Sequence, residues 1–202
     1  MVKQISIGVL GIQGAISEHV LIMQKVMLHH GLKNNVQIVR KKTELDKVQG
    51  LIIPGGESTT ISRFIISNNL SETIRERVKN QSLSVMGTCA GCVLVSSDMV
   101  DKSKDISLLS LMDMKVKRNA FGRQRESFEQ DIMIKGSSIL FSAVFIRAPL
   151  ILDTWGECKP LSLIDDGIVM AQQKNVLALS FHPELTNDTR IHELFYKIVD
   201  SY

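Results

Sequence analysis

Short apolar runs alternate with helix-like patterns along the first half of the chain. The runs that predict strands are residues 5–10, 36–39, 51–53 and 83–86. Apolar positions three and four residues apart predict helices between them. We expect one helix from Ser17, a candidate cap, to a stop at Gly31, and others over 59–67, 71–80 and 90–97. This alternation favours an α/β fold, with a mostly parallel sheet covered by helices on both faces.

The second half contains mainly strand-like runs. They cover residues 111–116, 127–134, 143–146, 168–172 and 176–181. Turn residues separate them at Gly122, Gly136, Asp165-Asp166-Gly167 and Lys174-Asn175. Short turns of this kind favour hairpins, so we expect an antiparallel extension of the sheet and a last helix over about 188–199. The chain has neither an internal repeat nor a Pro- or Ser-rich linker, which predicts a single domain over 1–202.

Composition and charge exclude several classes of protein. The 202 residues are 44% hydrophobic and 22% charged, which is ordinary for a folded domain. A net charge of +3 without a dense basic block argues against a nucleic-acid or membrane partner. The early apolar run is too short for a signal peptide, and the uncharged stretch 80–97 is too polar to span a membrane. We therefore expect a cytoplasmic protein.

The cysteines direct attention to chemistry. There are three, Cys89, Cys92 and Cys158, and an odd, low number is a poor disulfide framework. Cys89 lies in Gly87-Thr88-Cys89-Ala90-Gly91, between a predicted strand and a predicted helix. A nucleophile on such a sharp turn stands clear of the backbone when glycines flank it. The helix N-terminus favours a thiolate, and the N–H of Ala90 would face the oxyanion formed on attack.

Other interpretations of this turn remain open. Cys89 could be a small buried residue, which is the common environment of a free cysteine. Cys89 and Cys92 also form a C-x-x-C pair, the spacing of thiol oxidoreductases, although no Trp or Pro flanks it. Zinc is a weaker alternative, since no second cysteine or histidine pair completes four ligands. Cys158 has no obvious partner.

A thiolate nucleophile needs a proton shuttle, and His182 is the best candidate among five histidines. It ends an apolar run and precedes Pro183-Glu184, where an extended backbone would project His182 and Glu184 to the same side. Glu184 could then orient the imidazole. His19 falls in the first helix, and His192 is expected at the surface or end of the last one.

These motifs together resemble the triad (class I) glutamine amidotransferase family. Within it, the sequence is most similar to the glutaminase subunits of pyridoxal 5′-phosphate synthase. The stretches that carry this likeness are residues 8–15, 54–60, 87–91, 118–124, 126–129, 145–149 and 180–186. The resemblance implies a flavodoxin-like three-layer α/β sandwich.

It also implies roles for particular residues. Cys89 would attack the side-chain amide of glutamine, His182 would move the proton, and Glu184 would orient His182. Gly56 and Ala90 would form the oxyanion hole, and Gln13 would lie on a loop that faces the partner. The positions matching the family's glutamine-binding residues are Gly55, Gly56, Glu57, Arg118, Ile146 and Arg147. Without the likeness, Arg118 and Arg147 would be read as internal ion-pair partners of Glu57, Glu126 or Glu129.

The resemblance implies no cofactor and no metal. It implies delivery of ammonia to a separate (β/α)8-barrel synthase subunit within a large ring complex. Three alternatives stay open: a glutaminase serving another synthase, such as one for anthranilate, guanylate or an imidazole precursor; a thiol oxidoreductase; and a non-catalytic regulatory subunit.

Overall fold

The computed structural model describes residues 5–32, 35–100, 104–121 and 126–202. Its strands are β1 (Ile7–Leu10), β2 (Val36–Val39), β3 (Gly50–Ile53), β4 (Ser84–Thr88), β5 (Ser96–Met99), β6 (Met112–Lys117), β7 (Ser127–Ile132), β8 (Phe141–Ile146), β9 (Leu150–Thr154), β10 (Lys159–Ile164), β11 (Gly167–Gln173) and β12 (Val176–Leu179). Its helices are α1 (Ile16–His29), α2 (Lys42–Leu45), α3 (Ser58–Ser67), α4 (Leu70–Lys79), α5 (Ala90–Val95) and α6 (Arg190–Asp200), and a 3-10 turn covers Pro183–Leu185.

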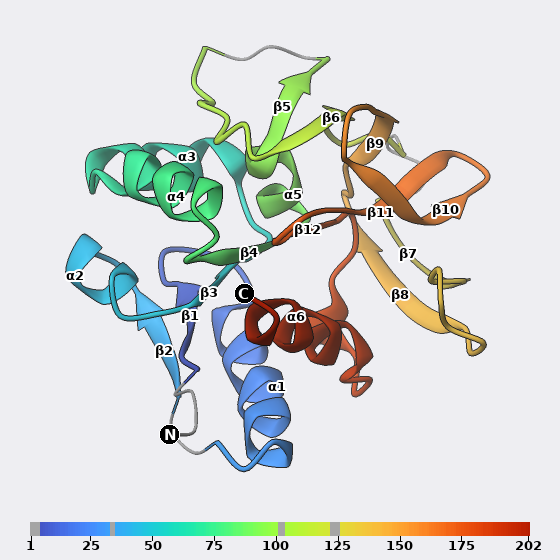
Figure 1. Cartoon of the computed structure of the whole chain (residues 1–202). Helices are drawn as coiled ribbons and strands as arrows, with labels where there is room; N and C mark the ends of the chain where they lie inside the picture. The colour runs from blue at the N-terminus through green and yellow to red at the C-terminus, as the bar shows by residue number, and fades with distance from the viewer. Residues whose placement is uncertain (1–4, 33–34, 101–103, 122–125) are drawn as a thin grey trace.

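One curved sheet of ten strands forms the centre of the molecule (Figure 1). Its strand order is β2-β1-β3-β4-β12-β11-β9-β6-β5, with β10 paired to β11. Strands β2, β1, β3 and β4 are parallel neighbours, as the first half of the sequence predicted, and β12 from the second half joins them parallel to β4 rather than antiparallel. Thr88 pairs with Leu179, so the carboxyl ends of β4 and β12 lie side by side. Functional residues that follow these two strands are therefore brought together.

The antiparallel extension is also confirmed, with one difference. β11 pairs antiparallel with β12, β10 and β9, and two-residue turns at Asp165-Asp166 and Lys174-Asn175 close hairpins. A turn also forms at Gly136, whereas the turn expected at Gly122 lies outside the described residues. β7 and β8 do not extend the main sheet but form a separate two-stranded sheet.

Two helix boundaries differ from the sequence prediction. The helix expected over 90–97 ends at Val95, because the Ser96 hydroxyl donates to the Val93 carbonyl (2.7 Å) and the chain turns into β5. α1 begins after Ala15 without a side-chain cap, while Ser17 donates to the neighbouring Glu18. Ser17 is therefore not the cap. The sequence pattern also did not predict α2, β5, β9 and β10.

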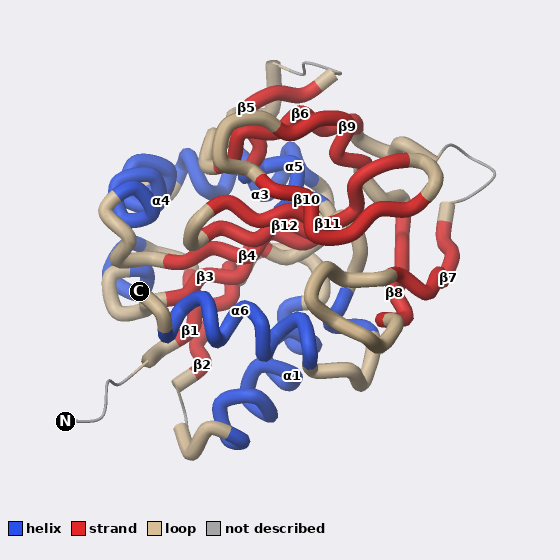
Figure 2. Tube along the Cα trace, turned by 45° about the vertical axis from the view of Figure 1, so that its right-hand side comes forward, coloured by secondary structure: helices blue, strands red, loops and turns tan. Residues whose placement is uncertain are grey.

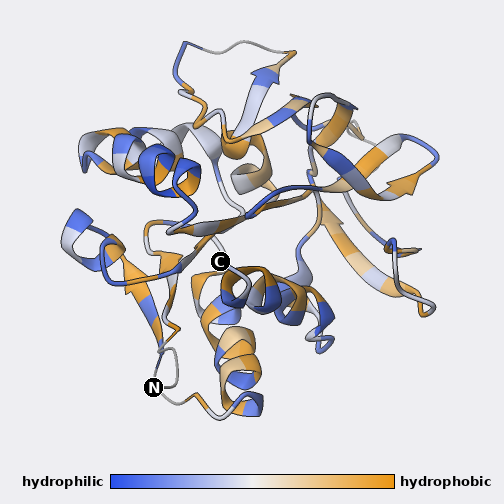
Figure 3. Ribbon diagram, viewed as in Figure 1, coloured by the Kyte–Doolittle hydropathy of each residue, from blue (hydrophilic) through white to orange (hydrophobic). Residues whose placement is uncertain are grey.

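Helices cover both faces of the sheet. α1 and α6 pack on one face, and α2, α3, α4 and α5 pack on the other (Figures 1 and 2). Two clusters of buried apolar residues fill the spaces between the layers, one below each helix group. Figure 3 shows that α1 and β8 are mostly hydrophobic along their length. No described helix is both long and apolar enough to cross a lipid bilayer.

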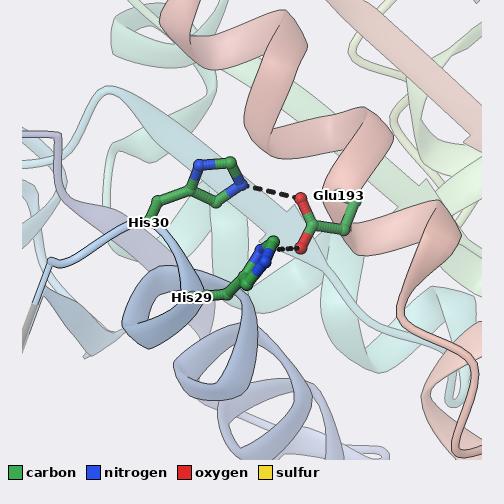
Figure 4. Close-up of side chains that lie close together, drawn as sticks. All are labelled: His29, His30 and Glu193. Atoms are coloured by element: carbon green, nitrogen blue, oxygen red, sulfur yellow. Dashed lines mark hydrogen bonds and ion pairs between the residues drawn. The ribbon is translucent and has the colours of Figure 1, made fainter.

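A polar contact joins the ends of α1 and α6. Glu193 lies 3.3 Å from His29 Nδ1 and 2.8 Å from His30 Nε2 (Figure 4). The His30 ring stacks on Tyr196 with the ring centres 4.1 Å apart. These contacts join α1 to α6. The same two helices carry the buried His19 and His192.

Candidate active site

Cys89 occupies a strained turn between β4 and α5. Its backbone has φ +50° and ψ −105°, which non-glycine residues rarely adopt. The turn is held by its N–H, which donates to Leu179 of β12 (2.8 Å), and by close packing of two glycines. A Cβ at Gly87 would lie 2.5 Å from the Gly91 carbonyl oxygen, and one at Gly91 would lie 2.1 Å from that of Ile53. The flanking glycines are thus required by the space around the turn, as the sequence spacing predicted.

His182 and Glu184 follow β12, the strand beside β4. His182 Nδ1 and Glu184 Oε1 are 2.7 Å apart, and the two residues are only 8% and 5% exposed. The expected pairing is present, but the expected extended backbone is not. Pro183 instead starts a 3-10 turn, a position where its fixed φ and missing N–H cost nothing. That turn, rather than strand alternation, brings the carboxylate beneath the imidazole.

The pKa of His182 is raised to about 10. Burial alone would lower it, but interactions with Cys89 and Glu184 favour the protonated ring and outweigh that effect. His182 Nε2 is buried and makes no hydrogen bond with the described residues, so it remains available to the reacting atoms. The imidazolium therefore has a negative partner on one side and the nucleophile on the other.

The loop after β3 closes over both residues. A Cβ on Gly55 would lie 2.4 Å from His182 Cε1 and 3.2 Å from Cys89 Cβ, so only glycine fits there. Gly56 has φ +148°, and Gln13 Oε1 accepts from the N–H of Glu57 at 3.3 Å. The Gln13 loop is thereby attached to the Gly55–Gly56 loop. The N–H groups of Gly56 and Ala90 donate to none of the described residues.

A cavity of about 400 Å³ opens beside Cys89. The expected site residues all reach it except Glu184, which lies behind His182. Its lining consists of Gln13, Gly14, Ala15, Gly55, Gly56, Glu57, Ser58, Cys89, Ala90, Val93, Arg118, Asn119, Ile146, Arg147, Pro149 and His182. The Cys89 thiol lies 3.7 Å from the Ile146 carbonyl oxygen. The volume suits a ligand of amino-acid size.

No acidic side chain among the described residues forms an ion pair with either arginine of the cavity. The Arg118 guanidinium lies 3.4 Å from the Ser58 hydroxyl, to which it donates. Among the described residues neither Arg118 nor Arg147 forms an ion pair with Glu57, Glu126 or Glu129. Arg147 is exposed and has φ +41°, an unusual conformation fixed just after β8. Both charges therefore remain available to an anionic group in the cavity.

Glu57 lines the cavity, but its carboxylate is already bound. It accepts from the N–H groups of Thr59 (3.0 Å) and Thr60 (2.7 Å) and so caps α3. Burial opposes ionisation, yet these donors outweigh it and lower the pKa of Glu57. The sequence motif predicted that Glu57 belongs to the site, and Glu57 does line the cavity, but the motif did not reveal that its side chain caps α3.

The other thiols are poorly suited to redox chemistry. Burial, followed by the charges of Cys89 and Cys158, raises the pKa of the fully buried Cys92 thiol well above its ordinary value. Burial and then Asp113 raise the pKa of Cys158 to about 11. Thiol exchange requires a thiolate, so neither is a good resolving partner for Cys89. Among the described residues, the one cluster able to hold a metal is His29, His30 and Glu193, which includes no cysteine.

Two histidines beside the candidate triad were not assigned a role from the sequence. His19 and His192 are fully buried, so His192 does not lie at the surface, although it does lie at the end of the last helix, in the first turn of α6. The signal that could have found them is helical spacing. His19 precedes Met23 and Met27 by four and eight residues, and His192 precedes Phe195 and Val199 by three and seven, so each lies on the buried face of its helix.

The chain is similar to known proteins over nearly its whole length. A model of the SNO glutamine amidotransferase family matches residues 9–201. A protein of Thermosipho africanus named pyridoxal 5′-phosphate synthase subunit PdxT is 46% identical over 193 residues, covering 96% of this chain and 98% of its own. A protein of the same name from Staphylothermus marinus is 47% identical, covering 94% and 96% of the two chains.

Solved structures show the same fold. One described as a glutamine amidotransferase has a TM-score of 0.86 and 38% identity, covering 96% of this chain and 98% of its own. A putative GMP synthase protein from Thermoplasma acidophilum has a TM-score of 0.65 at 17% identity, covering 100% and 97%. The second likeness concerns the fold alone. Together with the strand order, these structures confirm the expected flavodoxin-like sandwich.

Proposed function

Because the chain belongs to the SNO glutamine amidotransferase family, we propose that it uses a Cys89-His182-Glu184 triad to hydrolyse L-glutamine to L-glutamate and ammonia. Its relatives of 46% and 47% identity are named as subunits of pyridoxal 5′-phosphate synthase. From that name we infer that the ammonia is used in vitamin B6 biosynthesis. The observation that carries the triad is the 2.7 Å contact between His182 and Glu184 beside the strained Cys89 turn.

The reaction has two steps at Cys89. The thiolate attacks the side-chain carbonyl carbon of glutamine, and the C–N bond breaks as His182 gives its proton to the leaving ammonia. The product is a glutamyl thioester. His182, now neutral, takes a proton from water, whose oxygen attacks the thioester and releases glutamate and the thiol. Glu184 accepts a hydrogen bond from His182 Nδ1 throughout and keeps Nε2 directed at the reacting atoms.

The oxyanion of each tetrahedral intermediate needs donors that are free in the resting enzyme. We assign this role to the N–H groups of Gly56 and Ala90, which the described residues leave unused. Ala90 contributes from the N-terminus of α5, where unpaired N–H groups favour negative charge. Loss of one such donor typically costs roughly 10²–10³ in kcat.

The substrate would lie along the cavity with its amino-acid end toward the two arginines. Arg118 and Arg147 can neutralise its α-carboxylate, since among the described residues neither is paired with Glu57, Glu126 or Glu129. The main chain of Gly55, Gly56 and Ile146 can hold the polar groups of glutamine. We expect Glu57 to shape the cavity through its cap on α3 and its contact with Gln13.

The ammonia would pass to the synthase component of pyridoxal 5′-phosphate synthase, which is a separate barrel protein. We place the contact at the exposed Gln13 loop, because Gln13 already touches the loop that carries the proposed oxyanion donor Gly56. Docking there would fix the position of the oxyanion donors, so we expect the isolated chain to hydrolyse glutamine slowly. We further propose that residues 1–202 act as one amidotransferase domain on a ring-shaped synthase, in a reducing compartment such as the cytoplasm.

The decisive experiment is a glutamate-release assay with and without the synthase component. Cys89→Ala should abolish release, whereas Cys158→Ala, which removes a thiol outside the cavity, should retain it. Turnover by Cys89→Ala would overturn the proposal. Full activity of Cys92→Ser would exclude a thiol oxidoreductase. Co-purification with another synthase would indicate that the ammonia is delivered to that enzyme instead.

A further inference from the structure

The buried polar contacts of the proposed triad continue beyond Glu184. One carboxylate oxygen, Oε1, faces His182, and the other, Oε2, lies 3.3 Å from Nε2 of His19. Both side chains of this second contact are fully buried. Glu184 Oε2 makes no hydrogen bond with the described residues, so the 3.3 Å approach of His19 is a close polar contact to an otherwise unsatisfied oxygen. The carboxylate is thus held between two imidazoles, from the turn after β12 and from α1.

The contacts of His19 continue away from the cavity. Its Nδ1 lies 3.1 Å from Nε2 of His192 on α6, and its Nε2 lies 3.3 Å from the hydroxyl of Thr88 at the end of β4. His192 is fully buried, and its second ring nitrogen makes no hydrogen bond with the described residues. A buried row therefore runs from His182 through Glu184 and His19 to His192.

We propose that His19 is a positioning residue of the active site, whose Nε2–H faces the unsatisfied Oε2 of Glu184 and keeps the carboxylate aligned with His182. His192 completes the device by fixing which nitrogen of His19 carries the proton. This inference rests on the proposed triad and adds one residue on each of two helices to it.

The position of the proton on His19 follows from the carboxylate that its Nε2 faces. An ionised carboxylate only accepts, so the nitrogen of His19 that faces it must carry the proton. A neutral His19 protonated at Nε2 has a lone pair at Nδ1, which requires a donor, and His192 Nε2–H is 3.1 Å away. The opposite arrangement would direct a lone pair of His19 at Glu184 and leave that carboxylate oxygen without a donor, at a high cost in a buried site.

The charge of His19 matters as much as its geometry. Burial, then the nearby His192 and His182, lower the pKa of His19 well below its ordinary value. The titratable groups that face it are His192 from α6 and His182 and Glu184 from the turn after β12, while Thr88 of β4 is neutral. A neutral donor orients Glu184 without neutralising it, so the negative charge remains available to His182.

The test compares two substitutions of His19 in the complex with the synthase component. His19→Gln keeps an N–H near the position of Nε2, whereas His19→Leu has similar bulk and no donor. We expect His19→Leu to lower kcat about tenfold or more, the cost of a hydrogen bond to a charged group, with KM within about twofold. His19→Gln should recover activity to within about threefold of the unmodified enzyme.

A pH profile separates positioning from mere support of the fold. If Glu184 is no longer aligned, it holds the His182 proton less tightly, so the alkaline limb of kcat/KM should move to lower pH in His19→Leu only. The matched control is Met23→Ala, which creates a cavity on the same buried face of α1. It should lower the melting temperature without moving that limb. An unshifted profile with normal kcat in His19→Leu, or equal losses in Leu and Gln variants, would overturn the inference. An unmodified enzyme that releases no glutamate would instead refute the proposed function.

Discussion

At the residue scale, His182 combines two environments that act in opposite directions on its proton. It is 8% exposed, and such burial normally disfavours an imidazolium. Glu184 at 2.7 Å and the adjoining Cys89 reverse this effect, so the pKa rises to about 10 instead of falling. His192 is fully buried and contacts no carboxylate among the described residues, and burial lowers its pKa to about 3. The contrast shows that a buried histidine holds its proton only where hydrogen bonds and charges that favour the imidazolium outweigh the cost of burial.

This contrast predicts a measurable dependence on Cys89. We expect the His182 ring signal in histidine-labelled protein to titrate near pH 10, and Cys89→Ala to lower that value because one of the groups favouring the proton is lost. Since the folded-state pKa exceeds the ordinary value of about 6.5, the stabilisation from protonated His182 is complete below about pH 6.5. It is lost as the pH rises through about 10. Cys158→Ala serves as the control, and equal titration in all three proteins would contradict the assignment.

At the element scale, the sequence predicted local structure best at positions that only one residue type can occupy. Gly87 and Gly91 predict the sharp turn because any Cβ there would meet backbone oxygen. The short β5 was missed because Ser96-Ser97-Asp98-Met99 carries no alternating pattern, and only its pairing with β6 makes it a strand. His192 was correctly expected near a helix end, but its burial was missed because a polar residue was assumed to face solvent. Partners from distant elements decide such cases, and a single sequence does not show them.

The cap of α3 gives a prediction at this scale. Glu57→Ala removes the acceptor for the N–H groups of Thr59 and Thr60, which should cost roughly 0.5–2 kcal/mol of unfolding free energy. Glu57→Asp, a shorter but favoured cap, should retain most of it. Urea unfolding measures this difference, and the KM for glutamine measured alongside shows whether the carboxylate also binds substrate. A raised KM with unchanged stability in Glu57→Ala would mean that binding, not capping, is its main role.

At the scale of the whole molecule, the central strands join the two helix layers. Along β4, Val85 belongs to the apolar cluster under α2–α5 and Met86 to the one under α1 and α6. Ala178 and Leu179 divide in the same way along β12. Cys89 begins a helix on one face, while the His19–His192 row lies beneath helices on the other. The proposed active site therefore depends on both layers at once.

The same connection predicts that the two halves of the chain unfold together. Cys92, in α5, lies in the parallel half, and Cys158, between β9 and β10, lies in the antiparallel half. Both thiols are buried, at 0% and 5% exposure, so each reacts with an alkylating agent only after its surroundings open. In a Cys89→Ala background, brief alkylation across a urea gradient should label both at the same midpoint, which mass spectrometry of the two peptides can resolve. Because Val85 and Met86 bury opposite faces of one strand, the loss of either layer exposes apolar surface of the other. Labelling of Cys158 well before Cys92 would instead reveal an antiparallel half that opens independently, and would contradict a single domain over 1–202.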